Sequence, residues 1–258
     1  MDTELLFTVR QFLEEKVRMY NRRDFIQGDP IQVPHQFQRQ ENIEIAAFLT
    51  ATIAWGRRDT IIKNALDLMS RMDHNPYEFL MDLKKDDLKV FDGFRHRTFN
   101  EQDCHFFIWS LHEIYKNKGG IYPLFLAAYS QNRNIKHAIF VFRDIFFGIH
   151  HSPRSEKHLA NPYTGSAAKR LNMFLRWMIR KDGNGVDFGI WDRISPADIF
   201  VPLDVHTGNV ARKLGLLSRK QNDWKAVEEL TGVLRGFDPS DPVKYDFALF
   251  GLGIFEDY

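Results

Sequence analysis

Lys169 is the residue of this chain whose position best suits covalent chemistry. It follows Ser166, a favourable N-cap residue, so a helix capped by Ser166 would carry Lys169 at its third position. The positive end of the helix dipole disfavours an ammonium group there and favours the neutral, nucleophilic amine. Two other interpretations stay open: a lysine that extends into solvent, and one that binds a phosphate beside the helix N-terminus.

Asp204 is the second candidate, 35 positions further along the chain. It follows Pro202 and precedes a short helical pattern, which predicts an N-cap. Hydrogen bonds from backbone N–H groups also keep such a carboxylate ionised at neutral pH. Because a fixed carboxylate can stabilise a developing positive charge, capping and catalysis are compatible in this residue.

Charge is distributed unevenly around these two residues. Between Lys169 and Lys225 there are 11 Lys and Arg and 6 Asp and Glu, whereas the whole chain has a net charge of only +1. A basic segment on a mildly acidic body is one sign of a polyanion-binding surface, and a solvated charged face is the commoner alternative.

Composition excludes several other classes of protein. The single cysteine, Cys104, rules out an intramolecular disulfide, a cysteine-rich zinc site and a four-thiolate iron–sulfur cluster. No glycine-rich nucleotide loop is present, and we expect neither a metal nor a cofactor. The sequence also contains no membrane span and no signal peptide, which predicts a location in the cytoplasm.

The elements that must position Lys169 and Asp204 are helices. Apolar residues recur with helical spacing, no convincing strand alternation is present, and Asn, Asp and Gly residues stand at the expected helix ends. The pattern predicts an all-α protein of about ten helices, among them residues 5–13, 41–54, 61–69, 101–117, 134–149, 166–183 and 204–215, with two more starting near Asp223 and Pro242.

The segments around both candidates resemble the helix-hairpin-helix DNA glycosylase superfamily. Its members have a Gly-x-Gly hairpin turn followed two residues later by a lysine, and here residues 165–169 read GSAAK, with Ala167 in place of the second glycine. Their aspartate lies in a Val-Asp-x-His-Val stretch before a helix that ends Arg-Leu-Gly, and here residues 202–206 read PLDVH and 210–215 read VARKLG. Residues 47–53, AFLTATI, are similar to the apolar second helix of the superfamily.

The resemblance covers roughly residues 36–254. The stretches RWMIR, PLDVH and DPVKYDFALFGLG also resemble a bacterial family of unknown function within or near the superfamily. The implied fold is a helix-hairpin-helix glycosylase-like fold, with a six-helix barrel at about 36–183, which includes the hairpin, and a second helical lobe made of about 1–35 and 184–258.

The implied function is excision of a damaged base from duplex DNA, with an oxidised purine as one candidate lesion. Lys169 would attack C1′ of the sugar and form a Schiff base, which adds β-lyase activity, and Asp204 would stabilise the positively charged sugar. The alternative is a non-catalytic nucleic-acid-binding protein, in which Lys169 contacts a phosphate and Asp204 is only a cap. In either case we expect a monomer that acts on DNA in the bacterial cytoplasm, at the nucleoid.

The resemblance also implies further site residues. The loop 55–58 falls where relatives insert a wedge into the duplex. The expected DNA contacts are Gly165, Ser166, Arg170, Arg176, Arg180, Arg57, Arg58 and His206. A flipped base needs an aromatic pocket, for which the candidates are Trp55, Trp177 and Trp191.

Overall fold

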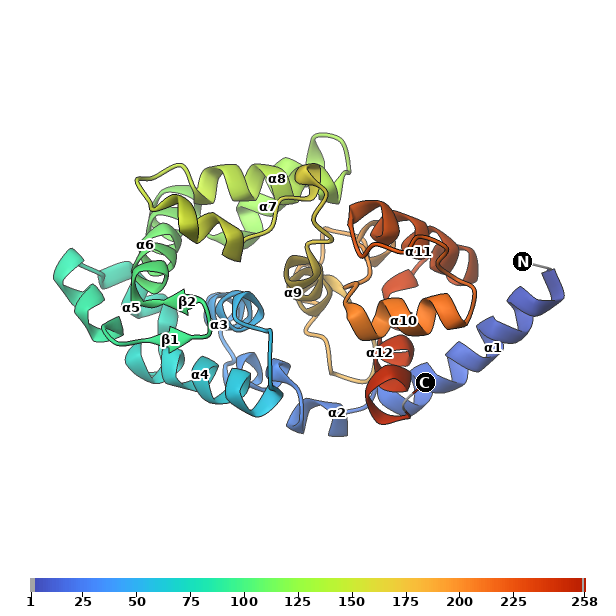
Figure 1. The fold of residues 1–258 in the computed structure, drawn as a ribbon. Helices are drawn as coiled ribbons and strands as arrows, with labels where there is room; N and C mark the ends of the chain where they lie inside the picture. The colour runs from blue at the N-terminus through green and yellow to red at the C-terminus, as the bar shows by residue number, and fades with distance from the viewer. Residues whose placement is uncertain (1–2, 257) are drawn as a thin grey trace. The chain divides into compact units, whose positions relative to one another are not determined.

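The computed structural model describes residues 3–256 and 258, and these residues are mostly helical (Figure 1). The only β-sheet among them is an antiparallel pair of two-residue strands, β1 (Arg95–His96) and β2 (Phe99–Asn100). The predicted all-α class is therefore correct as far as secondary-structure content is concerned. No described helix is long and apolar enough to cross a membrane.

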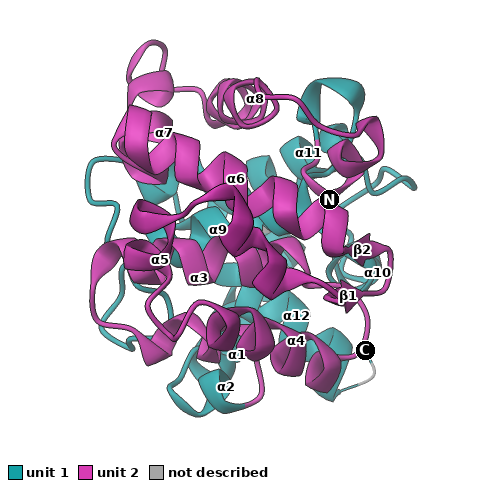
Figure 2. Ribbon diagram, turned by 90° about the vertical axis from the view of Figure 1, so that its left-hand side faces the viewer, with its two compact units in different colours: residues 1–27, 161–258 teal, residues 28–160 magenta. Residues whose placement is uncertain are grey.

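The chain divides into two compact units, which are coloured separately in Figure 2. Unit 1 consists of residues 1–27 and 161–258, and unit 2 of residues 28–160. These boundaries differ from the expected ones at 36 and 183, because residues 161–183, where the hairpin and the helix after it were expected, belong with the two ends of the chain. An isolated β-bridge between Ser166 and Asp223, together with the ion pairs described below, ties them there.

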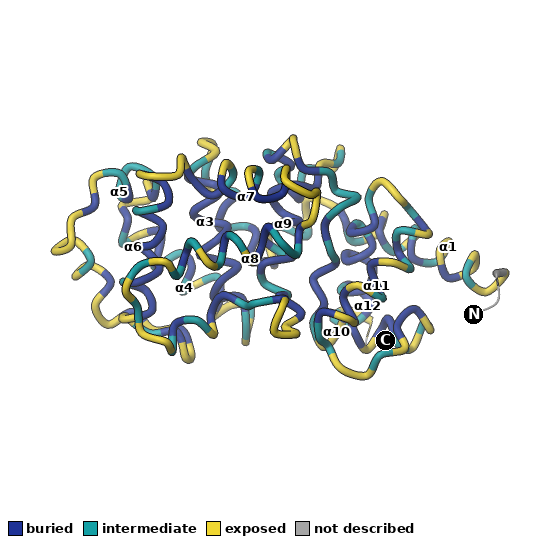
Figure 3. The backbone as a smooth tube through the Cα atoms, turned by 90° about the horizontal axis from the view of Figure 1, so that it is seen from above, coloured by how far each residue is buried: buried dark blue, intermediate teal, exposed yellow. Residues whose placement is uncertain are grey.

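Unit 2 is built on a helix that is buried on nearly every side. Its helices are α3 (Gln40–Thr52), α4 (Arg58–Arg71), α5 (Pro76–Asp82), α6 (Glu101–Lys118), α7 (Ile121–Ser130) and α8 (Ile135–Phe146). Eleven of the 13 residues of α3 are buried, as expected for a helix with apolar residues on nearly every side (Figure 3). Phenylalanine rings fill the space around it: Phe107 and Phe146 have ring centroids 4.8 Å apart, and Phe48 and Phe142 5.5 Å apart.

Unit 1 joins the two ends of the chain. Its helices are α1 (Thr3–Tyr20), α2 (Asp24–Gln27), α9 (Lys169–Ile179), α10 (Val205–Lys213), α11 (Trp224–Phe237) and α12 (Tyr245–Phe255). Helix α12 packs against both α1 and α10. Gly251 permits the first of these contacts, because a Cβ at that position would lie 2.2 Å from Cδ2 of Tyr20.

The observed helix ends agree with the sequence-based predictions at some positions and differ at others. The predicted cap Asp204 and the predicted helix start near Asp223 are correct, since each of these side chains accepts a hydrogen bond from the backbone N–H three residues on. Helix α4 begins earlier than the expected range 61–69: its first residue is Arg58 and its N-cap is Arg57. Helix α5 and the β1–β2 pair were not predicted, because both are too short to display a period.

Candidate functional site

A short exposed turn leads into α9. Residues Pro162–Thr164 form a 3₁₀ turn, η5, in which Asn161 Oδ1 accepts a hydrogen bond from the N–H of Tyr163 at 2.9 Å. Gly165 ends this turn with φ +90°, a conformation that glycine adopts without strain. Gly165 and Ser166 are both exposed, so the turn presents backbone to solvent.

Helix α9 begins later than the sequence predicts. Ser166 Oγ accepts a hydrogen bond from Ala168 N at 3.2 Å, which closes a local turn instead of capping the helix. Ala168 is the N-cap residue with φ +46°, and the helix starts at Lys169. Lys169 is therefore the first helical residue rather than the third, and no side chain caps the N-terminus of α9.

Asp204 is held at the start of α10. Its Oδ1 accepts a hydrogen bond from Thr207 N at 2.9 Å, and its carbonyl oxygen accepts one from Asn222 Nδ2 at 2.9 Å. The capping bond fixes the plane of the carboxylate, so the position of Oδ2 is determined by the helix.

The structure brings the two candidates together. Lys169 Nζ lies 4.0 Å from Asp204 Oδ2, at the beginnings of two helices that are separate in sequence. The side chains are 28% and 22% exposed, so the pair is partly shielded and still open to solvent. A partly shielded pair has a stronger mutual attraction than a fully exposed one, because the effective dielectric constant is lower.

Arg176 and Arg180, which were predicted to contact DNA, lie in the interior of unit 1. They are 4% and 2% exposed. Arg176 Nε lies 3.2 Å from Asp187 Oδ1, and Arg180 Nη1 lies 3.0 Å from Asp187 Oδ2. Because a buried guanidinium paired with carboxylates is not available to a phosphate, the predicted role of both arginines is wrong.

This network of ion pairs extends in both directions from Asp187. Arg180 also pairs with Asp182 at 2.6 Å and with Asp241 at 2.9 Å. In the other direction, Arg176 donates through Nη1 to Asp246 on α12. The guanidinium groups of Arg176 and Arg180 therefore face acidic side chains of unit 1 rather than solvent.

Asp246 belongs to the same neighbourhood as the candidate pair. Burial raises the pKa of its carboxyl to about 6; Arg176 opposes the rise, the negative charge of Asp204 adds to it, and Lys169 opposes it. The carboxyl is therefore within electrostatic reach of both candidate residues. Sequence reasoning overlooked it, although an acid within the apolar run YDFALFGLG is a recognisable signal.

The remaining predicted DNA contacts have different environments. His206, the second residue of α10, is exposed and lies close to Asp204 in sequence. Arg170 is half-buried. Burial lowers the pKa of the Arg170 guanidinium to about 10, so it stays charged at neutral pH. In unit 2, Arg57 is exposed and pairs with Asp59 at 2.7 Å, and Arg58 is half-buried.

The predicted pocket tryptophans do not form one group. Trp177 and Trp191 are completely buried in unit 1, and Trp191 meets Phe174 edge to face with ring centroids 5.4 Å apart. Both therefore belong to the core, and their predicted role as pocket walls is wrong. Trp55, in unit 2, is half-buried and stacks on His158 with ring centroids 5.8 Å apart.

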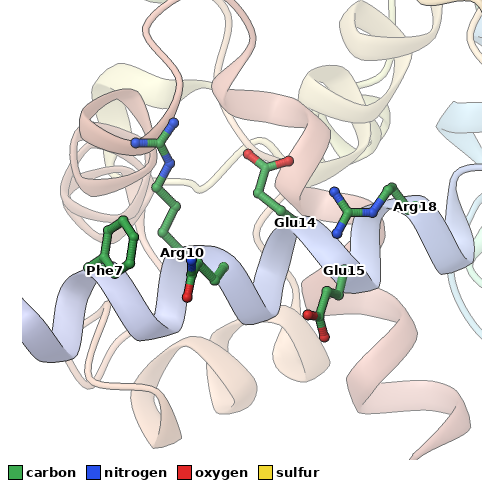
Figure 4. A pocket seen from close by; sticks show the side chains of 6 residues that line it. Phe7, Arg10, Glu14, Glu15 and Arg18 are labelled. Atoms are coloured by element: carbon green, nitrogen blue, oxygen red, sulfur yellow. The ribbon is translucent and has the colours of Figure 1, made fainter.

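A hollow elsewhere in unit 1 is separate from these residues. It has a volume of about 500 Å³ and lies along α1, lined by Phe7, Arg10, Gln11, Glu14, Glu15 and Arg18 (Figure 4). None of the predicted site residues lines it. Among residues 3–256 and 258, no group of three or more His, Cys, Asp and Glu side chains could hold a metal ion.

The fold and the site together define a class: a mostly helical protein with a lysine–aspartate pair at the starts of two helices. The chain matches the family described as "Protein of unknown function (DUF2400)" over residues 29–255, and it belongs to that family. The matched region includes Lys169, Asp204 and Asp246. No curated protein and no solved structure matches the chain.

Proposed function

We propose that this protein is a base-excision DNA glycosylase with β-lyase activity, built on a helix-hairpin-helix glycosylase-like fold. One observation supports the proposal above the others: Lys169 Nζ and Asp204 Oδ2 lie 4.0 Å apart. An amine and a fixed carboxylate at this distance are the two groups that covalent base excision requires.

The chemistry assigns one task to each group. Lys169, once its ammonium has lost a proton to solvent, attacks C1′ of the sugar with its nitrogen lone pair, and the C1′–N bond breaks. The departing base keeps the bonding electrons and takes up a proton. The Asp204 carboxylate stabilises the positive charge that develops on the sugar, with little reorganisation because its capping bond already holds it.

Strand cleavage follows from the covalent intermediate. When the sugar ring opens, Lys169 and C1′ form an iminium ion, which makes the proton on C2′ acidic. Loss of that proton creates a C2′–C3′ double bond and expels the 3′ phosphate with its electron pair. The enzyme is then released by hydrolysis of the imine.

The start of α9 supplies a place for a DNA phosphate. The first N–H groups of a helix have no partners within the helix, and no side chain caps those of α9. Together with the exposed backbone of Gly165 and Ser166, they form a site that favours a negative charge. Lys169, at the first position of the same helix, would then lie next to the backbone of a bound strand.

Borohydride trapping tests this proposal most directly. Incubation with an abasic duplex, and with duplexes that each carry one damaged base, should yield a covalent protein–DNA adduct after reduction. Lys169→Gln should abolish the adduct, while Lys225→Gln, which removes an exposed lysine on α11, should leave it unchanged. Asp204→Asn should slow base release by a factor of about 100 or more while DNA binding changes little.

Two results would contradict the proposal. One is an adduct that persists in Lys169→Gln; the other is the absence of an adduct on every duplex. If DNA binding survives without either activity, the protein is a non-catalytic nucleic-acid-binding protein, and Lys169 is a phosphate contact.

A further inference from the structure

The β1–β2 hairpin of unit 2 carries two exposed arginines, Arg95 and Arg97, on either side of a buried histidine. Strand β1 packs against α4 (Figure 1). The buried residue, His96, anchors the hairpin, because its Nε2 lies 3.0 Å from the carbonyl oxygen of Trp55 in the loop before α4. The two arginines are therefore attached to a fixed part of unit 2 and extend from it into solvent.

Arg97 lies at the tip of the hairpin in an unusual backbone conformation. Its φ is +54°, in the left-handed region that residues other than glycine seldom adopt. Its guanidinium lies against Gly56, where a Cβ would be only 2.8 Å from Arg97 Nη1. The strained tip and the absence of a side chain at residue 56 together place this guanidinium beside the loop before α4.

A third arginine reaches the same tip from a later segment. Arg154 belongs to the 3₁₀ turn η4 (Pro153–His158) and is half-buried. Its Nη2 donates to the carbonyl oxygen of Thr98 at 2.9 Å, and its Nη1 donates to Asn100 Oδ1 at 2.8 Å and to Asp103. We call Arg95, Arg97 and Arg154 the hairpin surface. These three cations contact one carboxylate, Asp103, which is completely buried.

No carboxylate among residues 3–256 and 258 pairs with either exposed arginine of the hairpin. The acids that flank the hairpin in sequence are engaged elsewhere: Asp92 Oδ1 lies 3.1 Å from His105 Nε2, and Glu101 Oε2 accepts a hydrogen bond from Gly93 N at 2.8 Å. Unit 2 as a whole has 17 Lys and Arg and 16 Asp and Glu, so the excess of positive charge at the hairpin surface is local. A local excess of this kind attracts a polyanion.

The chemistry of the hairpin surface suits the phosphates of a nucleic-acid duplex. A guanidinium group can bind a phosphate through two parallel N–H bonds, and all three cations here are arginines. None of the exposed large apolar side chains of the described residues belongs to this surface, whereas binding to a lipid surface would use them. Trp55 is half-buried and stacked on His158, so the surface offers no exposed ring on which the bases of a single strand would stack.

We infer that the hairpin surface is a second nucleic-acid contact, which binds the phosphate backbone of a DNA duplex without reading its sequence. It lies wholly within unit 2, so it is separate from the Lys169–Asp204 pair of unit 1. The contact requires no base excision, and only the choice of DNA rests on the proposed function. Arg95 and Arg97 supply the uncompensated charge, and Arg154 holds the tip between them and η4.

The salt dependence of duplex binding tests this inference. Fluorescence anisotropy with a labelled, undamaged duplex gives the dissociation constant at each salt concentration. The double variant Arg95→Gln with Arg97→Gln should bind roughly tenfold more weakly, and the slope of log Kd against log salt should fall by about 2, because each lost phosphate contact changes that slope by about 0.9. Unchanged affinity and slope would overturn the inference.

Lys116→Gln with Lys118→Gln is the matched control. Both lysines are exposed at the end of α6, so this variant removes the same charge from unit 2 at a different place. Its affinity should stay within about twofold of the wild type, with the same slope. An equal fall of the slope in both double variants would show that only the net charge matters and would contradict a defined surface.

Two further measurements apply if the double variant does not fold. Arg95→Lys with Arg97→Lys keeps both charges and should keep the salt slope, although the bidentate bonds are lost. In the wild type, bound duplex should slow the modification of Arg95 and Arg97 by phenylglyoxal severalfold and leave Arg133, an exposed arginine between α7 and α8, unaffected. Equal protection of all three arginines, or of none, would contradict the inference.

Two other readouts separate the competing explanations. Sedimentation of the wild type with phosphatidylserine vesicles, lost in Arg95→Gln with Arg97→Gln and without any binding to the duplex, would make this a membrane contact and would overturn the inference. If the duplex binds through Arg95 and Arg97 but borohydride traps no adduct, the proposed function fails and the hairpin surface stands. If an adduct forms while the double variant binds as tightly as the wild type, the proposed function stands and the hairpin surface is refuted.

Discussion

The two units differ in the kinds of side chain that they bury. Unit 2 packs phenylalanine against phenylalanine around α3, with Phe107 and Phe146 at its centre. Unit 1 has apolar residues as well, but it also buries two guanidinium groups, those of Arg176 and Arg180, among carboxylates. The first kind of core needs only the right volumes, whereas the second needs every partner in place.

This difference concerns what the buried charges of unit 1 can contribute. A buried ion pair seldom stabilises a fold more than well-packed apolar side chains would, so the network in unit 1 has little value as a source of stability. It does hold the carboxylate of Asp246, which accepts a hydrogen bond from Arg176 Nη1. We interpret the network as the support of a charged site, and the aromatic core of unit 2 as the support of a fold.

The largest effect on stability should come from the aromatic core. Phe146→Ala removes a completely buried ring and should lower the free energy of unfolding by about 4 kcal/mol. Urea unfolding followed by circular dichroism measures the loss, which should be the same at pH 5 and pH 7 because no charge is involved. Phe140→Ala, at an exposed position on the same helix, should cost less than about 1 kcal/mol. Comparable losses in the two variants would contradict the assignment of the core.

The charged interior of unit 1 should respond to pH. Burial raises the pKa of Asp246 from 3.8 to about 6, so the stabilising contribution of its protonated form is complete below pH 3.8 and is lost as the pH rises through 6. The free energy of unfolding of the wild type, relative to Asp246→Asn, should therefore fall by about 2 kcal/mol between pH 4 and pH 7. Paired urea titrations at the two pH values give this difference. A constant difference would show that the carboxyl titrates alike in the folded and unfolded states.

The smallest effect separates capping from catalysis at Asp204. Asp204→Ala loses the bond to Thr207 N and should lower the free energy of unfolding by about 1 kcal/mol, whereas Asp204→Asn keeps a capping oxygen and should change it by only a few tenths. Thermal unfolding of both variants measures these changes. Both should lose base excision equally, since neither retains the negative charge. Activity in Asp204→Asn comparable with that of the wild type would leave Asp204 with the cap as its only role.

Local sequence rules predicted much of the fold. The buried helix α3 followed from its apolar run, and the starts of α10 and α11 followed from Asp204 and Asp223. The start of α9 did not, because Ser166 has the side chain of a cap but uses it in a turn that places Ala168 at positive φ. That conformation depends on tertiary contacts, including the bridge from Ser166 to Asp223, and no local rule includes them.

The candidate site was only partly accessible from the sequence. Lys169 and Asp204 were named from their segments, and the distance between them needed the structure. Arg176 and Arg180 were misplaced because a helical stripe of basic residues has the same spacing whether it faces solvent or carboxylates. Asp187 follows them closely in the chain, but their partners Asp241 and Asp246 come from distant segments, so that part of the pairing is a property of the fold.

The contact between α1 and α12 has a consequence for the order in which the parts of the protein fold. Tyr20 stacks on Phe255 with ring centroids 5.6 Å apart, and Gly251 makes room for it. During synthesis, α1 leaves the ribosome first and has no partner until α12 follows, whereas unit 2 is continuous and can fold in the interval. The apolar face of α1 therefore stays exposed on the nascent chain through most of translation, and closure of this long-range contact is expected to be the slow, final step of folding.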